Sequence, residues 1–182
     1  MPFFASLEYR TATLRRLEAD YPLAVGTYAL SSWMYSLAGL IYLYLLPFLP
    51  PTHQTTPLLS GRMFGTLLVV QGACSFIHDG RITLGKPFPP GRHFWLLFDR
   101  CLAWLLMLTV VGNALVWPSC SKATRGVSVA LVLTCGVTYP SSKYCEVRGW
   151  MRSFLVLHSL WHYVPNLLAI IWISLCAAGN ES

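Results

Sequence analysis

Charged residues are scarce in this chain. Only 11% of its 182 residues are Asp, Glu, Lys or Arg, whereas 55% are hydrophobic, and soluble globular domains contain about 25% charged residues. So little charge cannot cover the surface of a water-soluble globule. The composition therefore predicts an all-α integral membrane protein, in which one membrane domain accounts for most of the chain.

Clusters of positive charge are also missing. The formal net charge is +6, yet no run of Lys or Arg is longer than the pair Arg15 and Arg16. Nucleic-acid binding needs a basic patch, so we expect no nucleic-acid partner. The first twenty residues contain six charged side chains, which leaves no room for the apolar core of a cleavable signal peptide.

Long apolar blocks make up most of the remaining sequence. A membrane-spanning helix needs roughly 17 to 25 apolar residues, and the blocks predict a bundle of about five transmembrane helices over residues 23–49, 57–78, 94–117, 125–140 and 150–178. Residues 1–22 are predicted to form an N-terminal cytosolic amphipathic segment, with a loose polar tail as the alternative. Residues 179–182 are predicted to form a C-terminal tail.

The distribution of Lys and Arg predicts the orientation. With five spans, nine Lys or Arg residues fall on the side of the N-terminus and only three on the other side. Cytosolic connections are enriched in positive charge. We therefore expect a cytosolic N-terminus, in an endomembrane (ER or Golgi) or the plasma membrane.

Ionisable side chains inside the predicted spans are candidates for function, because each is costly in lipid. Two of them, His158 and His162, are four residues apart and would stack on one helix face. His78, at the end of the second predicted helix, lies at similar depth. Three histidines from two helices leave one tetrahedral position open, as in catalytic zinc sites. The sequence thus predicts Zn2+ bound by His78, His158 and His162.

Other polar residues surround this predicted site. Ser75 precedes His78 by three residues and shares its helix face, so it is a candidate catalytic residue. Asp99 lies at the depth of the metal and would orient a histidine ligand or accept a proton from the reacting water. Asp79 should point about 100° away from His78, and we expect it to be a solvated carboxylate at the helix end.

Two other interpretations of the histidines stay open. A membrane histidine can be a buried residue with satisfied hydrogen bonds and no metal. Bis-histidine haem ligation needs histidines on facing helices, and it would leave one of His158 and His162 unused.

The string HSLWH at 158–162, together with a preceding Ser/His pair and an Asp, resembles the CREST superfamily of membrane hydrolases and receptors. This group includes alkaline ceramidases, adiponectin and progestin receptors, GPI-lipid remodelling hydrolases and myomaker-like proteins. The resemblance implies a seven-helix core, of which this chain would be a shortened member, and a zinc ion held by His78, His158 and His162 with Asp99 nearby. The family has serine four residues before the first histidine, where this chain has Cys74, so Ser75 matches approximately.

Two functions follow from these predictions. The first is a zinc-dependent, ceramidase-like or phospholipase-like hydrolase that cleaves an amide or ester bond in a membrane lipid. The second is a non-enzymatic receptor-like or assembly protein in which the metal only clamps helices together. In either case the protein lies in a lipid bilayer. The family core has more helices than this chain, and we expect that another copy of the chain or a different protein could supply them.

Overall fold

A computed structural model of the chain describes residues 3–49, 51, 54, 59–85, 91–116 and 122–178. These residues are all helical or form short connections. The helices are α1 (Phe3–Asp20), α2 (Pro22–Ser31), α3 (Trp33–Leu45), α4 (Gly61–Phe76), α5 (Arg92–Val116), α6 (Lys122–Arg148) and α7 (Met151–Ala178). A 3-10 turn, η1 (Leu46–Phe48), follows α3, and a π-helix, η3 (Ile77–Ile82), follows α4. Only Ser32 separates α2 from α3, so the described part of the chain has six helical rods.

Three of these rods are long and apolar enough to cross a membrane: Pro22–Phe48, Phe94–Gly112 and Met151–Ala178. They correspond to the first, third and fifth predicted spans. The prediction of five spans is wrong for the other two. α4 has only 16 residues, and α6, although it has 27 residues, is rich in Ser and Thr and carries charged residues near both ends.

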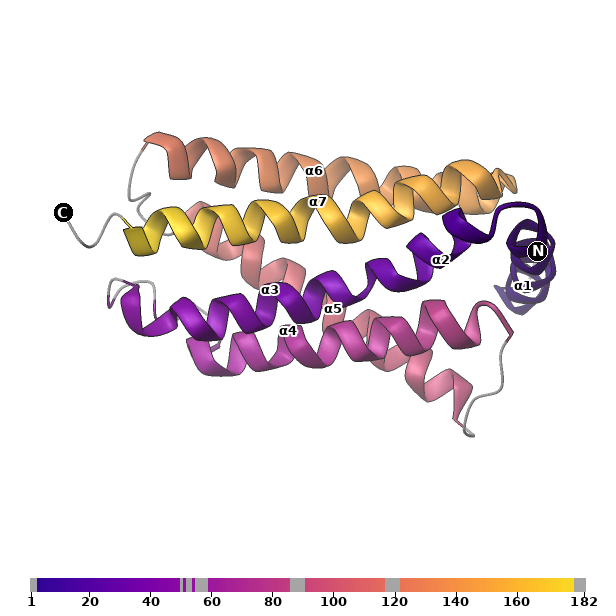
Figure 1. The fold of residues 1–182 in the computed structure, drawn as a ribbon, viewed down its shortest axis with the longest axis horizontal. Helices are drawn as coiled ribbons and strands as arrows, with labels where there is room; N and C mark the ends of the chain where they lie inside the picture. Colours follow the sequence, from indigo (N-terminus) through magenta and orange to yellow (C-terminus); the bar gives the residue numbers. More distant parts are fainter. Residues whose placement is uncertain are drawn as a thin grey trace.

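The rods form an elongated bundle (Figure 1). α6 and α7 lie side by side, and α3 packs against both α4 and α7, while α5 crosses obliquely behind them. α1 lies across one end of the bundle, near the start of α7. Both η3 and the start of α7 are at this end, so the two segments that contain the predicted histidines meet there.

Glycines allow α3 and α4 to approach each other closely. A Cβ atom at Gly39 would lie 2.7 Å from the Gly65 carbonyl oxygen, and one at Gly72 would collide with Ser36. Ser36 Oγ donates a hydrogen bond to the Val69 carbonyl oxygen at 2.9 Å. Small residues commonly permit such backbone contact between membrane helices.

A tight turn joins α6 to α7. Gly149 has φ of 75°, the left-handed conformation that favours glycine. The Trp150 amide donates to the Cys145 carbonyl and the Gly149 amide to the Glu146 carbonyl, the pattern of a Schellman motif. The segment 140–148 is therefore helical, where a connection was predicted. The hairpin places the end of α6 beside the start of α7.

Candidate metal centre

The residues predicted to form the site lie around one polar chamber of about 50 Å³. Ser75, His78, Asp99, His158 and His162 all line it, and all are buried. They come from α4, η3, α5 and α7. The structure thus brings together all five residues, although their roles as ligands or catalytic groups stay predictions.

Asp79 also lines the chamber, contrary to the expectation that it is solvated. Its side chain is only 1% exposed. The reason is that η3 has neighbours on more than one side. Tyr28 of α2 and His158 of α7 contact the Asp79 carboxylate, whereas Asp99 of α5 lies beside His78. Both His78 and Asp79 are therefore buried.

Asp79, His158 and His162 form a group whose nearest ligand atoms all lie within 4.8 Å of one another, and this group could hold a metal ion. Asp79 Oδ2 is 3.2 Å from His158 Nε2 and 3.9 Å from His162 Nε2. Ligand atoms around a tetrahedral zinc with bonds of 2.0 to 2.2 Å are about 3.3 Å apart. The distance between Asp79 and His158 matches this spacing, whereas the distance between Asp79 and His162 is wider.

The hydrogen bonds of Ser31 define the tautomer of neutral His162. Ser31 Oγ donates its only hydrogen to the Tyr28 carbonyl at 2.7 Å, so it must accept the hydrogen of His162 Nδ1, which is 2.8 Å away. His162 Nε2 then has a free lone pair. This lone pair and the Asp79 carboxylate oxygen are two acceptors near each other in a buried place, an arrangement that a cation between them would stabilise.

His158 has a similar environment. Its Nδ1 atom is 3.2 Å from Ser142 Oγ, and its Nε2 atom is directed toward Asp79 Oδ2. Both histidines of α7 therefore have Nδ1 beside a serine hydroxyl and Nε2 in the group with Asp79. Metal-binding histidines usually have their second ring nitrogen hydrogen-bonded in this way.

The second oxygen of Asp79 is held by other groups. Tyr28 Oη donates to Asp79 Oδ1 at 2.6 Å, and His78 Nδ1 is 3.2 Å from the same oxygen. Burial raises the pKa of the Asp79 carboxyl, but interactions with His158 and His78 outweigh this and hold the pKa well below its ordinary value. Asp79 is thus a carboxylate, the form that binds metals.

His78 and Asp99 line the same chamber but do not belong to the group formed by Asp79, His158 and His162. His78 Nδ1 is 3.4 Å from Asp99 Oδ2, and Gln71 Nε2 donates to Asp99 Oδ1 at 2.8 Å. His78 Nε2 is buried and has no hydrogen-bond partner among the described residues. A buried unpaired nitrogen is unfavourable, so this atom is available to a ligand or ion in the chamber.

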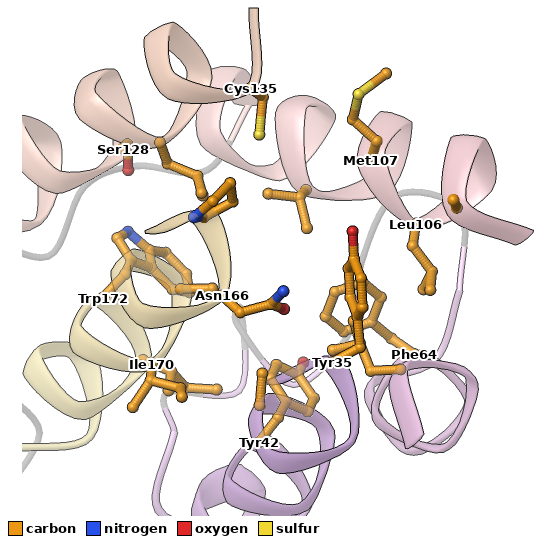
Figure 2. A pocket seen from close by; sticks show the side chains of 18 of the residues that line it. Tyr35, Tyr42, Phe64, Leu106, Met107, Ser128, Cys135, Asn166, Ile170 and Trp172 are labelled. Atoms are coloured by element: carbon orange, nitrogen blue, oxygen red, sulfur yellow. The ribbon is translucent and has the colours of Figure 1, made fainter. Parts of the chain in front are cut away.

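A larger apolar cavity of about 90 Å³ adjoins the chamber (Figure 2). Four residues line both spaces: Tyr35, Ala103, Met107 and Trp161. The cavity is otherwise lined mainly by hydrophobic side chains from α3, α4, α5, α6 and α7. Figure 2 shows the Asn166 amide among these side chains. A polar chamber beside an apolar cavity suits a ligand with a polar end and a hydrocarbon chain.

Sequence reasoning missed four hydrogen-bonding residues of the site: Tyr28, Ser31, Gln71 and Ser142. All are uncharged, and the first three lie within predicted spans, where polar residues are a weak signal of interior position. Ser142 was placed at the start of a connection.

Comparisons with protein-family models, curated protein sequences and solved structures gave no significant match to this chain. The function is therefore argued from the geometry of the site.

Proposed function

We propose that this protein is a zinc-dependent membrane hydrolase that cleaves an amide or ester bond in a lipid. The observation that supports this most is the buried pair of acceptors, His162 Nε2 and Asp79 Oδ2, with His158 Nε2 beside them. Two histidines and a carboxylate are a known ligand set of catalytic zinc, which keeps its fourth position open.

Hydrolysis is the chemistry that suits such a site. Zinc, when bound, polarises a carbonyl group and makes water nucleophilic near neutral pH. Asp99 and His78 lie side by side in the chamber, with Asp99 Oδ2 3.4 Å from His78 Nδ1, where they would orient the water or receive its proton. Ser75 is buried on the same wall and would hydrogen-bond the substrate.

The adjoining cavity supports a lipid substrate. It is lined mostly by apolar side chains and shares residues with the chamber, so an acyl chain in the cavity would place the adjacent amide or ester near Asp79. The HSLWH motif, with its resemblance to the CREST superfamily, favours the same substrate class.

A metal clamp without catalysis is the second candidate. It is favoured by the position of the group, because Asp79 on η3 and the histidines on α7 would be tied together by one ion. An Asp99→Asn variant separates the two: an enzyme should lose turnover of lipid amides and esters but retain its metal, whereas a clamp has no turnover to lose.

The first test is elemental analysis of detergent-purified protein beside His158→Ala and His162→Ala. About one zinc per wild-type chain, lost in both variants, is the expected result. Iron instead of zinc would overturn the proposed chemistry, because two histidines and one carboxylate also bind Fe(II) in oxygenases. Absence of any metal from folded wild type would overturn both candidates.

A further inference from the structure

Two cationic side chains line the chamber beside the candidate ligands. Arg100 extends from α5 and Lys143 from α6, and both are only partly exposed. Trp104 and Tyr139, whose ring centroids are 5.9 Å apart, also line the chamber. Among the described residues these are the Lys and Arg side chains that line this space, and neither has a role in the proposed metal centre.

Lys143 is held in place by its neighbours but retains the capacity to bind an anion. Its Nζ atom is 2.8 Å from Glu146 Oε2 and 5.9 Å from the centre of the Tyr139 ring. An ammonium group has three donors, so the ion pair with Glu146 does not exhaust it. Arg100, on another helix, offers a planar guanidinium that suits the oxygens of a phosphate.

The charges of the occupied chamber favour an anion. A divalent metal with Arg100 and Lys143 would bring four positive charges, whereas Asp79 and Asp99 supply two negative ones. Glu146 compensates one more, at Lys143. Excess positive charge in a partly buried space is costly unless an anion accompanies it. The chamber therefore prefers a ligand with a negative group.

We propose that Arg100 and Lys143 bind the negatively charged group of an amphiphile, of the phosphate-ester class, whose hydrocarbon chain occupies the adjoining apolar cavity. The proposal rests on the proposed function for the metal's charge, and it deepens that function by assigning the substrate to anionic lipids. The shared lining residues Tyr35, Met107 and Trp161 would then surround the junction of head group and chain.

The test measures binding of octyl phosphate to the full chain in phosphatidylcholine nanodiscs, with empty nanodiscs subtracted. Octyltrimethylammonium and inorganic phosphate are the comparison probes. We expect octyl phosphate to bind at least about tenfold more tightly than either, because only it has both the charge and the chain. The double variant Arg100→Gln/Lys143→Gln should lose about tenfold of that affinity.

A matched control is available on the same helix. Lys122 and Arg125 are exposed near the start of α6, about 30 Å along the helix axis from Lys143. Lys122→Gln/Arg125→Gln removes the same charge and should leave binding unchanged. Arg100→Lys/Lys143→Arg keeps the charge and should bind octyl phosphate, which guards against a variant that simply misfolds.

Zinc content, measured in every preparation, keeps this inference separate from the proposed function. Unchanged octyl phosphate affinity in the Gln double variant, with zinc present, would overturn the inference alone. Inorganic phosphate that binds as tightly as octyl phosphate would overturn the assignment to lipids. Zinc-free wild type would contradict the proposed function and remove the metal's charge from the argument, so the inference would then stand only if octyl phosphate still bound and the Gln variant lost that affinity.

Discussion

The two carboxylate oxygens of Asp79 have different surroundings. Oδ1 accepts the hydrogen bond of Tyr28 and lies beside His78, whereas Oδ2 faces the Nε2 atoms of His158 and His162. Tyr28 thus fixes one oxygen, while the other faces the two histidines. This arrangement makes Asp79 a better candidate for the third ligand than His78, which the sequence favoured.

Asp79→Asn should therefore weaken zinc binding more than His78→Ala does. Asn keeps the shape but loses the charge that a metal ligand supplies, and we expect zinc affinity to fall by more than about 100-fold. Loss of an outer residue typically costs about 10 to 100-fold, the range expected for His78→Ala. Titration against a competing chelator measures both. A larger loss in His78→Ala would restore His78 as the ligand.

Ser31 should matter for zinc although it does not reach the metal. Ser31→Ala removes the acceptor that holds the hydrogen on His162 Nδ1, so zinc affinity should decrease by about 10 to 100-fold.

The adjacent Ser32 is the control, because it has the same side chain and its buried hydroxyl has no hydrogen-bond partner among the described residues. Ser32→Ala should leave zinc affinity unchanged, as the same chelator titration would show; equal losses in both variants would contradict the role of Ser31.

The sequence allowed prediction of the histidine pair because a four-residue spacing places two side chains on one helix face, and the structure has the two rings 4.7 Å apart. It did not predict the orientation of Asp79. The burial of Asp79 depends on Tyr28 of α2 and His158 of α7, which approach it from other helices. The hydrogen bonds of Tyr28 and Ser142 depend on tertiary packing, so the sequence did not predict them either.

At the scale of helices, the long apolar spans were predictable and the amphipathic ones were not. α7 is apolar over most of its length, so its range agrees with the prediction to within a residue or two. α6 buries a face on which Thr124, Ser128 and Ser142 stand together with Leu131, Cys135 and Cys145. Hydropathy alone therefore marked only its apolar centre, 125–140, as helical and left its last turns as a connection.

The contact between α3 and α4 should be sensitive to a single methyl group. Gly72→Ala would push its Cβ into Ser36. The helices would have to separate, which should lower the free energy of unfolding by about 1 to 3 kcal/mol. We expect a lower midpoint of thermal unfolding in detergent and weaker zinc binding, because α4 continues into η3.

Gly136→Ala is the control for this substitution. A Cβ at Gly136 meets nothing within 4 Å, and alanine favours the helix over glycine by about 1 kcal/mol. The unfolding midpoint should therefore stay the same or increase. If Gly72→Ala behaves like Gly136→Ala, the close approach of α3 and α4 does not contribute to stability.

Over the whole molecule, α1 closes the end of the bundle that contains the candidate metal centre. Leu14 and Leu17 are buried in a cluster with residues of α2 and α7, including Val25, Tyr28 and Phe154. Tyr28 belongs both to this cluster and to the hydrogen bonds of Asp79. The N-terminal helix is therefore packed against the residues that support the site.

Arg15 joins α1 to the segment just after η3, and its loss should loosen this end of the molecule. Its guanidinium donates to the carbonyl oxygens of Leu84 and Gly85, and hydrogen bonds from a charged donor contribute about 1.5 to 3 kcal/mol when buried. Arg15 is exposed, so we expect about 1 kcal/mol or less. Arg15→Ala should accelerate amide hydrogen exchange over residues 80–85. Arg16 is also exposed and makes no such hydrogen bond to the residues that the structure describes, so Arg16→Ala should leave exchange there unchanged. Equal exchange in the two variants would mean that the apolar contacts of Leu14 and Leu17 alone hold α1 in place.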